Sequence, residues 1–463
     1  MSVPKSVHHF DWTYAFTHRL KTTSVATSSF LPRVETLAPR LAEEVSQGIL
    51  PYLGMPYRDS LEADLPPVLD HARKYRHMLL LGIGGSALGA RALQKAFFPA
   101  QDRPGHNGPW LWIADNIDAD TLEAWMASLD PADTVVVVVS KSGGTIETMA
   151  QYFLVRRWLK KGLGEGWKDH VVAVTDVRAG ELRAEAEREG LASLPVPDHL
   201  GGRYSVLSAV GLLPASFLGM DWKGLMDGAG AASEPLLAPL RTGESPIPAL
   251  ARHPAWHLAV WNRELMEHGY DELIFFSYVP LWNYFGAWFS QLWAESLGKE
   301  GKGSMPVPAV GVTDQHSVNQ MFLDGPRNKA CLFLTSGTLA PGPAFGTDVL
   351  PKWNWLSDKR FGDLLQAEAL GTRMALTRSG VPLVNADMAA TDENAAGRLM
   401  GVLMTATILT GWLLDINPID QPAVELGKRL ANARLGAPGH DEEHQALAAF
   451  LGRKGQGSAV QEF

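Results

Sequence analysis

The sequence has a single cysteine among its 463 residues, Cys331, which lies inside the apolar run ACLFL. One thiol excludes a disulfide within the chain and any metal site built from several cysteines. The N-terminus, MSVPKSVHHFDW, lacks the apolar stretch of a signal peptide. These absences fit a reducing compartment, and we expect a cytoplasmic protein.

Long apolar runs and excess basic charge are also missing. The most apolar stretch, LMGVLMTATILTGWLL at residues 399–414, is shorter than the roughly 20 residues of a membrane span, so we expect a buried helix and no membrane partner. Acidic residues outnumber basic ones by 50 to 41, which gives a formal net charge of −9. Nucleic acids select basic surfaces and are not expected partners, whereas a small anionic substrate needs only a few local cations.

What the sequence does have is a regular alternation of apolar strands and amphipathic helices. The expected strands are 77–83, 110–115, 133–140, 170–176, 271–278, 307–313, 331–335 and 381–386. Two helices are expected to begin near residues 87 and 314. Further helices are expected over 145–162, 180–190, 248–268, 282–298, 393–414 and 421–435. Continuously apolar strands that alternate with helices indicate parallel sheets covered on both faces. The prediction is an α/β protein with two doubly wound, mainly parallel-sheet domains and helical extensions.

The length allows more than one domain. We expect a helical or extended segment over 1–50, a first sheet domain over 51–225 and a second over 245–420. A C-terminal helix with a polar, loose tail should follow over 421–463. The link between the sheet domains should fall between Gly219 and Ser245, where Gly, Ala, Ser and Pro crowd together.

Two loops follow strands where ligands bind in open parallel sheets. In the first, LGIGGSALG, glycines including Gly85 let the backbone approach a ligand, and Ser86 adds a hydroxyl where a helix begins. A tight turn without ligand explains this loop as well. Dinucleotide binding is a third interpretation, because Gly82, Gly84 and Ala87 fit G-x-G-x-x-A and Asp115 ends the next strand.

The second loop, VVVVVSKSGGTIET, gathers three hydroxyls and a cation within six positions. They belong to Ser140, Lys141, Ser142 and Thr145. A helix cap needs only one of these hydroxyls, whereas several hydroxyls at a helix N-terminus form a phosphate cradle. The G-x-x-x-x-G-K-[ST] spacing of an ATP-binding loop is absent.

Together the two loops indicate a phosphate monoester site and resemble the sugar isomerase (SIS) domain. Three further stretches resemble signature segments of the glucose-6-phosphate isomerase family, and VELGK at 424–428 also matches. The three stretches are GGRYSVLSAVGL (201–212), QLWAESLGKEGKG (291–303) and TDQHSVNQMFLDG (313–325). The resemblance runs in order from residue 82 to residue 428. It implies reversible isomerisation of glucose 6-phosphate and fructose 6-phosphate without metal or redox cofactor.

Moving a proton between C1 and C2 of a sugar phosphate requires a carboxylate base and a cation near the developing oxyanion. Glu295 resembles the family's base, Gln291 its substrate-contacting glutamine, and Arg203, after Gly202, its arginine beside the enediolate. From the residues alone, an ion pair of Glu295 with Lys299 in one helix is the favoured interpretation. The alternative for Arg203 is a loop residue held by a salt bridge.

His316 and Lys428 gain a role only through the resemblance. In the family, the histidine assists ring opening and comes from the neighbouring subunit of a homodimer, and the lysine lies near the ring oxygen. Asp314 is a plausible N-cap, which would place His316 in a first helical turn. Otherwise His316 is an ordinary structural histidine and Lys428 a charge on a solvated helix face.

The resemblance places the phosphate on Gly85, Ser86, Ser140, Lys141, Ser142 and Thr145. Gly144 departs from the pattern, because the family usually has threonine there. A second pattern, His440-Asp-Glu-Glu443-His444, fits H-x-x-E-H, but its polar surroundings favour a solvated face over a metal site.

Two other functions remain open. A non-catalytic sugar-phosphate sensor would keep both loops without needing Glu295, Arg203 and His316 together. A nicotinamide-dependent dehydrogenase would use the Gly82 loop for pyrophosphate and leave the Ser140 loop unexplained.

Overall fold

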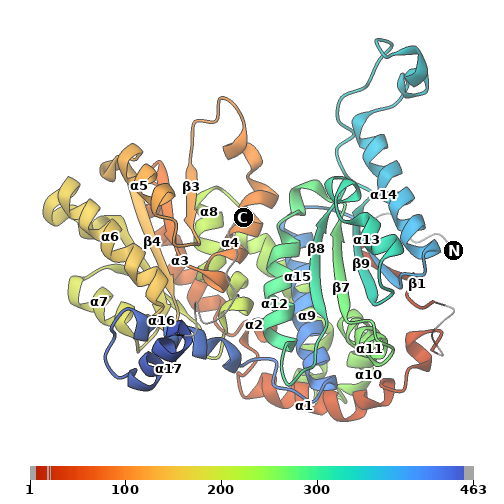
Figure 1. Cartoon of the computed structure of the whole chain (residues 1–463), viewed down its shortest axis with the longest axis horizontal. Coiled ribbons are helices and arrows are strands. Elements are labelled where there is room, and N and C mark those ends of the chain that lie inside the picture. Colours follow the sequence, from red (N-terminus) through yellow and green to blue (C-terminus); the bar gives the residue numbers. More distant parts are fainter. Residues whose placement is uncertain (1–6, 18–19, 21, 453–463) are drawn as a thin grey trace. The chain divides into compact units, whose positions relative to one another are not determined.

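The computed structural model describes residues 7–17, 20 and 22–452. The chain up to Ile416 forms one compact unit, and the chain from Asn417 onward forms another. The first unit contains two five-stranded sheets, each covered by helices (Figure 1). The α/β class and the mainly parallel sheets that the sequence predicts are therefore confirmed.

The first sheet is entirely parallel, with the strand order β3-β2-β4-β5-β6. Its strands are β2 (His77–Leu81), β3 (Trp110–Ala114), β4 (Thr134–Ser140), β5 (Val171–Asp176) and β6 (Ala192–Val196). Every residue of β4 is buried, as expected for the central strand of a sheet with two covered faces. The helices around this sheet are α3 (Arg58–Ala72), α4 (Leu88–Phe97), α5 (Ala119–Ser128), α6 (Ile146–Leu163), α7 (Glu181–Glu189) and α8 (Ala209–Phe217).

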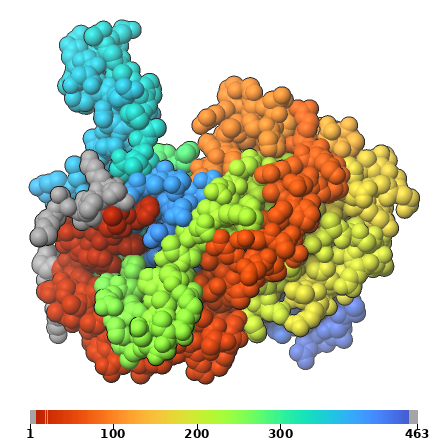
Figure 2. Space-filling view, turned by 180° about the vertical axis from the view of Figure 1, so that it is seen from behind, coloured from red at the N-terminus to blue at the C-terminus, as the bar shows by residue number. Residues whose placement is uncertain are grey.

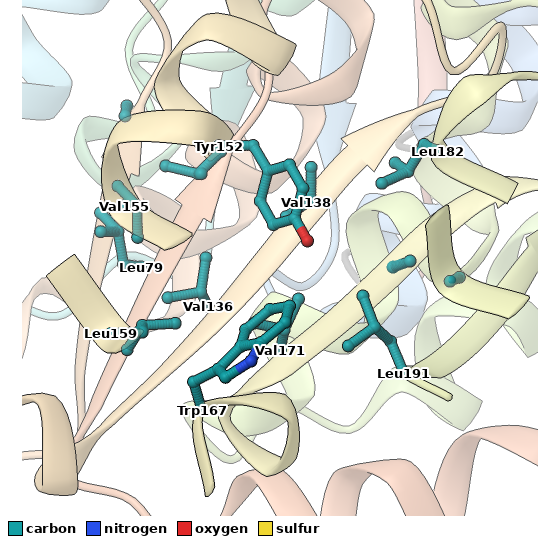
Figure 3. Close-up of a cluster of buried hydrophobic side chains, with 14 of the residues drawn as sticks. Leu79, Val136, Val138, Tyr152, Val155, Leu159, Trp167, Val171, Leu182 and Leu191 are labelled. Carbon is teal, nitrogen blue, oxygen red and sulfur yellow. The ribbon is translucent and has the colours of Figure 1, made fainter. Parts of the chain in front are cut away.

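Alternate side chains of β4 anchor a core on one face of this sheet. Val136 and Val138 point toward Tyr152 of α6 and the fully buried Trp167 (Figure 3). Burial of such side chains is the main stabilising contribution to the fold. The β-branched residues of β4 thus favour a strand, and they also provide the apolar surface on which α6 packs.

The second sheet has the strand order β1-β10-β9-β7-β8. Its strands are β1 (His9–Tyr14), β7 (Glu272–Ser277), β8 (Met305–Val310), β9 (Lys329–Ser336) and β10 (Leu383–Met388). All pairs are parallel except the pairing of β1 with β10. The N-terminal segment therefore completes the sheet formed by the second half of the chain. The helices of this half are α10 (Ile247–Arg252), α11 (Pro254–Glu267), α12 (Phe285–Leu297), α13 (Asn319–Asp324), α14 (Phe361–Arg378) and α15 (Glu393–Leu413).

The segment 219–245, expected as a link, is mostly helix α9 (Trp222–Thr242). Asp221 caps it by accepting a hydrogen bond from Gly224 N at 3.0 Å. Its small residues serve close packing rather than flexibility: a Cβ atom on Gly228 would lie 1.9 Å from the carbonyl oxygen of Asn394 in α15. The segment lies between β6 and β7 along the chain, and its glycine and alanine residues suit a tight helix crossing.

Helix α15 contains the apolar run 399–414. It is the one described helix long and apolar enough to cross a membrane by length and composition, and 94% of its apolar window is buried within the protein. The expectation of a buried helix is confirmed.

Several other elements differ from the prediction. His253 divides the helix expected at 248–268, because its backbone is extended and Pro254 starts α11. Strands β1 and β6 were not expected, since β1 is half-exposed and β6 contains Pro195 at the sheet edge. Helices α1 (Val34–Ser46), α2 (Pro51–Gly54), α3 and α14 were also not predicted individually.

Between β9 and α14, residues 337–360 form an extension that stands away from the second sheet with the start of α14 (Figures 1 and 2). It is closed at its base by a bridge between Ala344 and Arg360. We call residues 337–361 the arm.

The second unit contains α16 (Glu425–Arg434) and α17 (Asp441–Gly452). The tail expected to be loose after Gly436 is therefore helical over residues 441–452. Charged residues fill the first turn of α17, which stabilises a helix N-terminus. Residues 453–463 lie outside the described part.

Candidate active site

Three predicted site residues meet where α12 lies beside the 3₁₀ helix at Gly202–Leu207. Arg203 Nη1 lies 3.3 Å from Oε1 of Glu295, and Nε2 of Gln291 donates to Oε2 of the same carboxylate at 3.0 Å. The Arg203 side chain is 2% exposed and the Glu295 side chain 22%. The Glu295 carboxylate is thus held by donors from Arg203 and Gln291 and remains partly exposed.

Ser296 orients the arginine and was not singled out from the sequence. Its hydroxyl accepts a hydrogen bond from Arg203 Nε at 2.7 Å and lies 2.9 Å from the hydroxyl of Tyr204. Tyr204 stacks on Tyr52 at 5.4 Å between ring centroids. A serine in an apolar helix, directly after the candidate base, is the signal that marks this position. These contacts fix the plane of the Arg203 guanidinium, so its positive charge is held in one position beside the Glu295 carboxylate.

Backbone approach explains the glycines of the first loop and of the GGRYS segment. A Cβ atom on Gly85 would lie 2.2 Å from the carbonyl carbon of Gly202, and one on Gly84 would lie 3.0 Å from Nε2 of Gln291. Gly84 also has a φ of +56°, which favours glycine. Any side chain here would push the 3₁₀ turn Gly84–Ser86 away from Arg203 and Gln291. That turn precedes α4, which begins at Leu88 instead of the expected Ala87.

The hydroxyls of the second loop gather at the carboxyl end of β4. Ser140 Oγ donates to Thr145 Oγ1 at 3.1 Å, and the backbone N–H of Gly144 donates to Ser142 Oγ at 3.3 Å. Thr145 occupies the N-cap position of α6, but its side chain makes no capping hydrogen bond. The capping interpretation therefore leaves these hydroxyls unexplained. Because the 18-residue α6 begins at Ile146, its free amides and dipole favour an anion at this place.

Lys141 is turned away from solvent, and its Nζ donates to the carbonyl oxygen of Leu200 at 3.0 Å. Burial lowers the pKa of Lys141, and Asp176 and Asp198 oppose that shift. Gly143, with a φ of +67°, presses against the start of α7, where a Cβ atom would lie 2.8 Å from Leu182 N. The loop backbone is thus fixed by contacts with its neighbours. The Lys141 ammonium group bonds to the protein's own backbone at Leu200.

Both loops belong to adjacent parallel strands. Leu81 of β2 pairs with Val138 of β4, so the turn containing Gly85 and Ser86 and the loop 140–145 follow neighbouring strand ends. Such an edge is where doubly wound proteins bind phosphorylated ligands. The arrangement offers an anion cradle beside a carboxylate and a guanidinium, which suits proton transfer on a phosphorylated carbonyl compound.

His316 is not brought into this cluster. It ends a 3₁₀ helix, Thr313–His316, after β8 at one edge of the second sheet. Its side chain is exposed and makes no hydrogen bond or ion pair with the other described residues. The expected capping by Asp314 is wrong: the N-cap is Val312, and the Asp314 carboxylate accepts from Val310 N at 2.7 Å and Ser317 Oγ at 2.6 Å. Asp314 therefore ties the turn back to the strand.

Lys428 belongs to the second unit, on α16, and its Nζ lies 2.7 Å from Oε1 of Glu425. In the same unit, Glu443 pairs with Arg429 at 3.1 Å and lies 3.7 Å from His440. The acid of the H-x-x-E-H pattern is thus engaged in surface ion pairs. In the described part of the chain, no group of three or more His, Cys, Asp or Glu residues is arranged to hold a metal ion.

Asp115, the acid that a dinucleotide site would need, pairs with Arg91 at 2.8 Å. A carboxylate held by an arginine of α4 is a poor partner for a ribose hydroxyl. The dehydrogenase interpretation therefore lacks a free acid for the ribose, the second feature on which it depended.

Two doubly wound sheets, a hydroxyl-rich loop at a helix N-terminus and a carboxylate–arginine pair define the SIS class of sugar-phosphate isomerases. The phosphoglucose isomerase family matches residues 70–335. The glucose-6-phosphate isomerase of Rubrobacter xylanophilus is 39% identical over 394 residues, covering 83% of this chain and 88% of the relative. That of Thermus thermophilus is 37% identical over 411 residues, covering 85% of this chain and 94% of the relative.

Solved structures agree with this assignment. A hypothetical protein from Thermus thermophilus superimposes with a TM-score of 0.78 at 32% identity and covers 93% of this chain and 100% of that one. A glucose-6-phosphate isomerase from Chlamydia trachomatis shares the fold, with a TM-score of 0.66 at 24% identity over 85% of this chain and 77% of that one. The chain belongs to the phosphoglucose isomerase family and is an aldose–ketose isomerase.

Proposed function

We propose that the protein interconverts glucose 6-phosphate and fructose 6-phosphate through a cis-enediolate, in the cytoplasm and in the service of glycolysis and gluconeogenesis. The observation that supports this most is the Glu295–Arg203 pair beside the two loops of the first sheet. Glu295 removes the proton from C2 and returns it to C1, and the reverse reaction exchanges these carbons. One carboxylate that serves both carbons works on one face of the substrate, which corresponds to a cis intermediate.

Arg203 supplies the positive charge for the enediolate oxygens. Its guanidinium is buried, and a guanidinium stays charged in a dry site. Charge that is already positioned stabilises a developing oxyanion without further reorganisation. Gln291, which donates to Glu295, holds the carboxylate toward the reacting carbons.

The phosphate is proposed to bind Ser86, Ser140, Ser142 and Thr145 together with the backbone of Gly85 and Lys141. The free amides at the start of α6 add to these hydroxyls. Because Lys141 Nζ already donates to Leu200, its backbone matters more here than its charge. Binding energy from the phosphate then orients the carbons at Glu295.

Ring opening is assigned to His316 and Lys428, and His316 acts in the site of a partner subunit. Its exposure, and its lack of bonds to the other described residues, suit a side chain that completes a neighbouring site. The assembly is then a homodimer with two equivalent shared sites.

The arm supports the dimer as well. Leu350 is 70% exposed, Trp353 44%, Trp355 60% and Phe361 60%. Clustered large apolar side chains on a projection are typical of interaction surfaces. A second copy of the chain is the partner that the two-fold assembly supplies.

A coupled assay of fructose 6-phosphate conversion on the purified protein tests the proposal. Activity should appear without added nucleotide and should survive EDTA. A chain that binds the sugar phosphate without turnover would instead be a sensor. Loss of activity on chelation, restored by zinc or magnesium, would contradict the cofactor-free mechanism.

A further inference from the structure

A second cavity of about 360 Å³ lies beyond the end of β10, between β1, α9, α11 and the first half of α15. It shares no lining residue with the loops of the first sheet, the GGRYS segment or α12. Its volume falls in the range of small-molecule sites, about 300–1,000 Å³. It also lies at the carboxyl end of a parallel strand, where α/β proteins bind ligands.

The lining of this cavity is basic, although the chain as a whole is acidic. Among the described residues that line it there are four histidines and two arginines and no carboxylate. They are His8, His9, His253, His257, Arg252 and Arg398. Acidic residues outnumber basic ones across the sequence, so this local excess of basic groups is unusual for the chain. A concave site with cationic groups and no acid favours anions.

The two arginines lack partners within the described part of the protein. The side chains of Arg252 and Arg398 make no ion pair or hydrogen bond with the other described residues, although both residues lie within helices. The Nε of Arg398 is buried without any hydrogen-bond partner. A buried donor left unsatisfied is costly. An anion in the cavity would meet the terminal nitrogens of the Arg398 guanidinium, which are not among the buried unpaired atoms.

Two carboxylates lie near the histidines of the lining, but neither lines the cavity itself. Burial and the charge of Arg398 lower the pKa of His8, and Asp392 opposes that shift. Asp392 Oδ1 also caps α15 by accepting from Ala395 N at 2.9 Å. Asp387 lies 3.9 Å from Nε2 of His9. Nδ1 of His8 accepts from Ala389 N at 3.1 Å, which leaves its Nε2 as a donor. The free cationic groups are therefore the two arginines.

The remaining wall is apolar and partly aromatic. It includes Phe10, Trp12, Met388, Leu399 and Val402. Trp12 is held edge-on by His257 and Trp261, at 5.9 and 6.5 Å between ring centroids. A rigid indole offers a flat surface for a planar group. A hydroxyl-rich sugar would bury its polar groups against this wall without partners.

From this combination we infer that the cavity is a second ligand site, which binds an organic anion with a flat or apolar body. The body lies against Trp12 and Leu399, and its terminal carboxylate, sulfonate or phosphate pairs with Arg398 and Arg252. Arginine is suited to such planar, bidentate recognition. The site is separate from the sugar-phosphate site and does not depend on the reaction performed there.

Calorimetric titration of the full chain with 2-naphthoate tests the inference. We expect one molecule to bind per chain with a dissociation constant below about 1 mM, as suits a ligand of this size. The uncharged match, 2-naphthamide, should bind at least about tenfold more weakly, because it cannot form the charge-assisted pair. Saturating fructose 6-phosphate should leave naphthoate binding unchanged. Competition between the two, or equal binding of the amide, would overturn the proposal.

Variants then locate the site. Arg398→Gln should weaken naphthoate binding about tenfold, and Arg252→Gln should weaken it in the same direction. Arg188→Gln, a change of an exposed arginine on α7, is the matched control and should bind as the parent does. Thermal melting and isomerase activity show that each variant is folded. Unchanged binding by folded Arg398→Gln and Arg252→Gln proteins would refute the assignment.

Discussion

The loop that follows the central strand differs between the two sheets: it is short in the first sheet and long in the second. β4 is the central strand of the first sheet and β9 that of the second. After β4, residues 141–145 lead directly into α6. After β9, residues 337–360 pass through the arm before α14 begins.

We propose that this difference decides which sheet holds a phosphate. Hydroxyls also lie at or just after the end of β9, on Thr335, Ser336 and Thr338. Thr335 Oγ1 donates to Asp387 at 3.2 Å, and Ser336 Oγ lies 3.0 Å from Thr338 Oγ1. The next long helix along the chain, α14, begins only at Phe361, so this loop does not lead directly into a helix N-terminus whose amides and dipole attract an anion. A set of hydroxyls is therefore insufficient without the helix N-terminus behind it.

The largest expected effect concerns the base beside the first sheet. Glu295→Gln keeps shape and hydrogen bonding but removes the proton acceptor, so kcat should fall by roughly a hundredfold or more while substrate still binds. Steady-state kinetics in both directions measure this. The control is Glu300→Gln, which changes an exposed acid paired with Lys302 and should retain normal kcat. A near-normal kcat for Glu295→Gln would place the base elsewhere.

The next test asks whether the second sheet contributes His316 across a subunit boundary. His316→Ala and Glu295→Gln proteins should each be inactive or nearly so. After mixing and exchange, half of the dimers are mixed, and each has one site with both defects and one with neither. Activity should return to roughly a quarter of the parent value. If subunits exchange demonstrably and activity stays absent, the site is not shared.

Breaking the arm should have a smaller, concentration-dependent effect. Replacing Trp353 and Trp355 by serine removes exposed aromatic surface, and we expect the dimer dissociation constant to rise about ten- to a hundredfold. Sedimentation at several concentrations measures it. Folding should be unaffected, because both side chains are exposed. Leu451→Ser, an exposed apolar change in the second unit, is the control. An unchanged dissociation constant would remove the arm from the interface.

Apolar periodicity predicted most of the parallel strands, because buried β-branched runs such as β4 have few alternatives. It failed where small residues occur both in loops and in closely packed helices. In α9, for example, Gly228 permits a close helix crossing. It also failed for β1, whose pairing with β10 joins residues far apart in sequence. For the site, resemblance to the family's signature segments found Arg203, Glu295 and Gln291. It did not find Ser296, whose role depends on the direction of the Arg203 side chain.

A matched pair of serines compares the two loops directly. Ser142→Ala should raise KM for fructose 6-phosphate about tenfold, because one hydrogen bond to a charged group is lost. Ser336→Ala, at the end of β9 in the second sheet, should leave KM unchanged. The kcat of both variants should stay close to that of the parent. Equal effects on KM would mean that the two sheets do not differ as proposed.

The smallest effect is expected from restoring the hydroxyl that the family usually carries at Gly144. A Cβ atom there meets nothing within 4 Å, so a side chain fits without moving the loop. Gly144→Thr should lower KM for fructose 6-phosphate about threefold, the value of one modest hydrogen bond.

Gly144→Val is the matched control, since it has the same branching and the same loss of backbone freedom without the hydroxyl. A threonine variant that gains affinity while the valine variant does not would show that phosphate binding at this loop is limited by a missing donor. Equal KM values for the two variants would assign any change to loop stiffness instead, and the first sheet would then bind phosphate through the start of α6 and its existing hydroxyls alone.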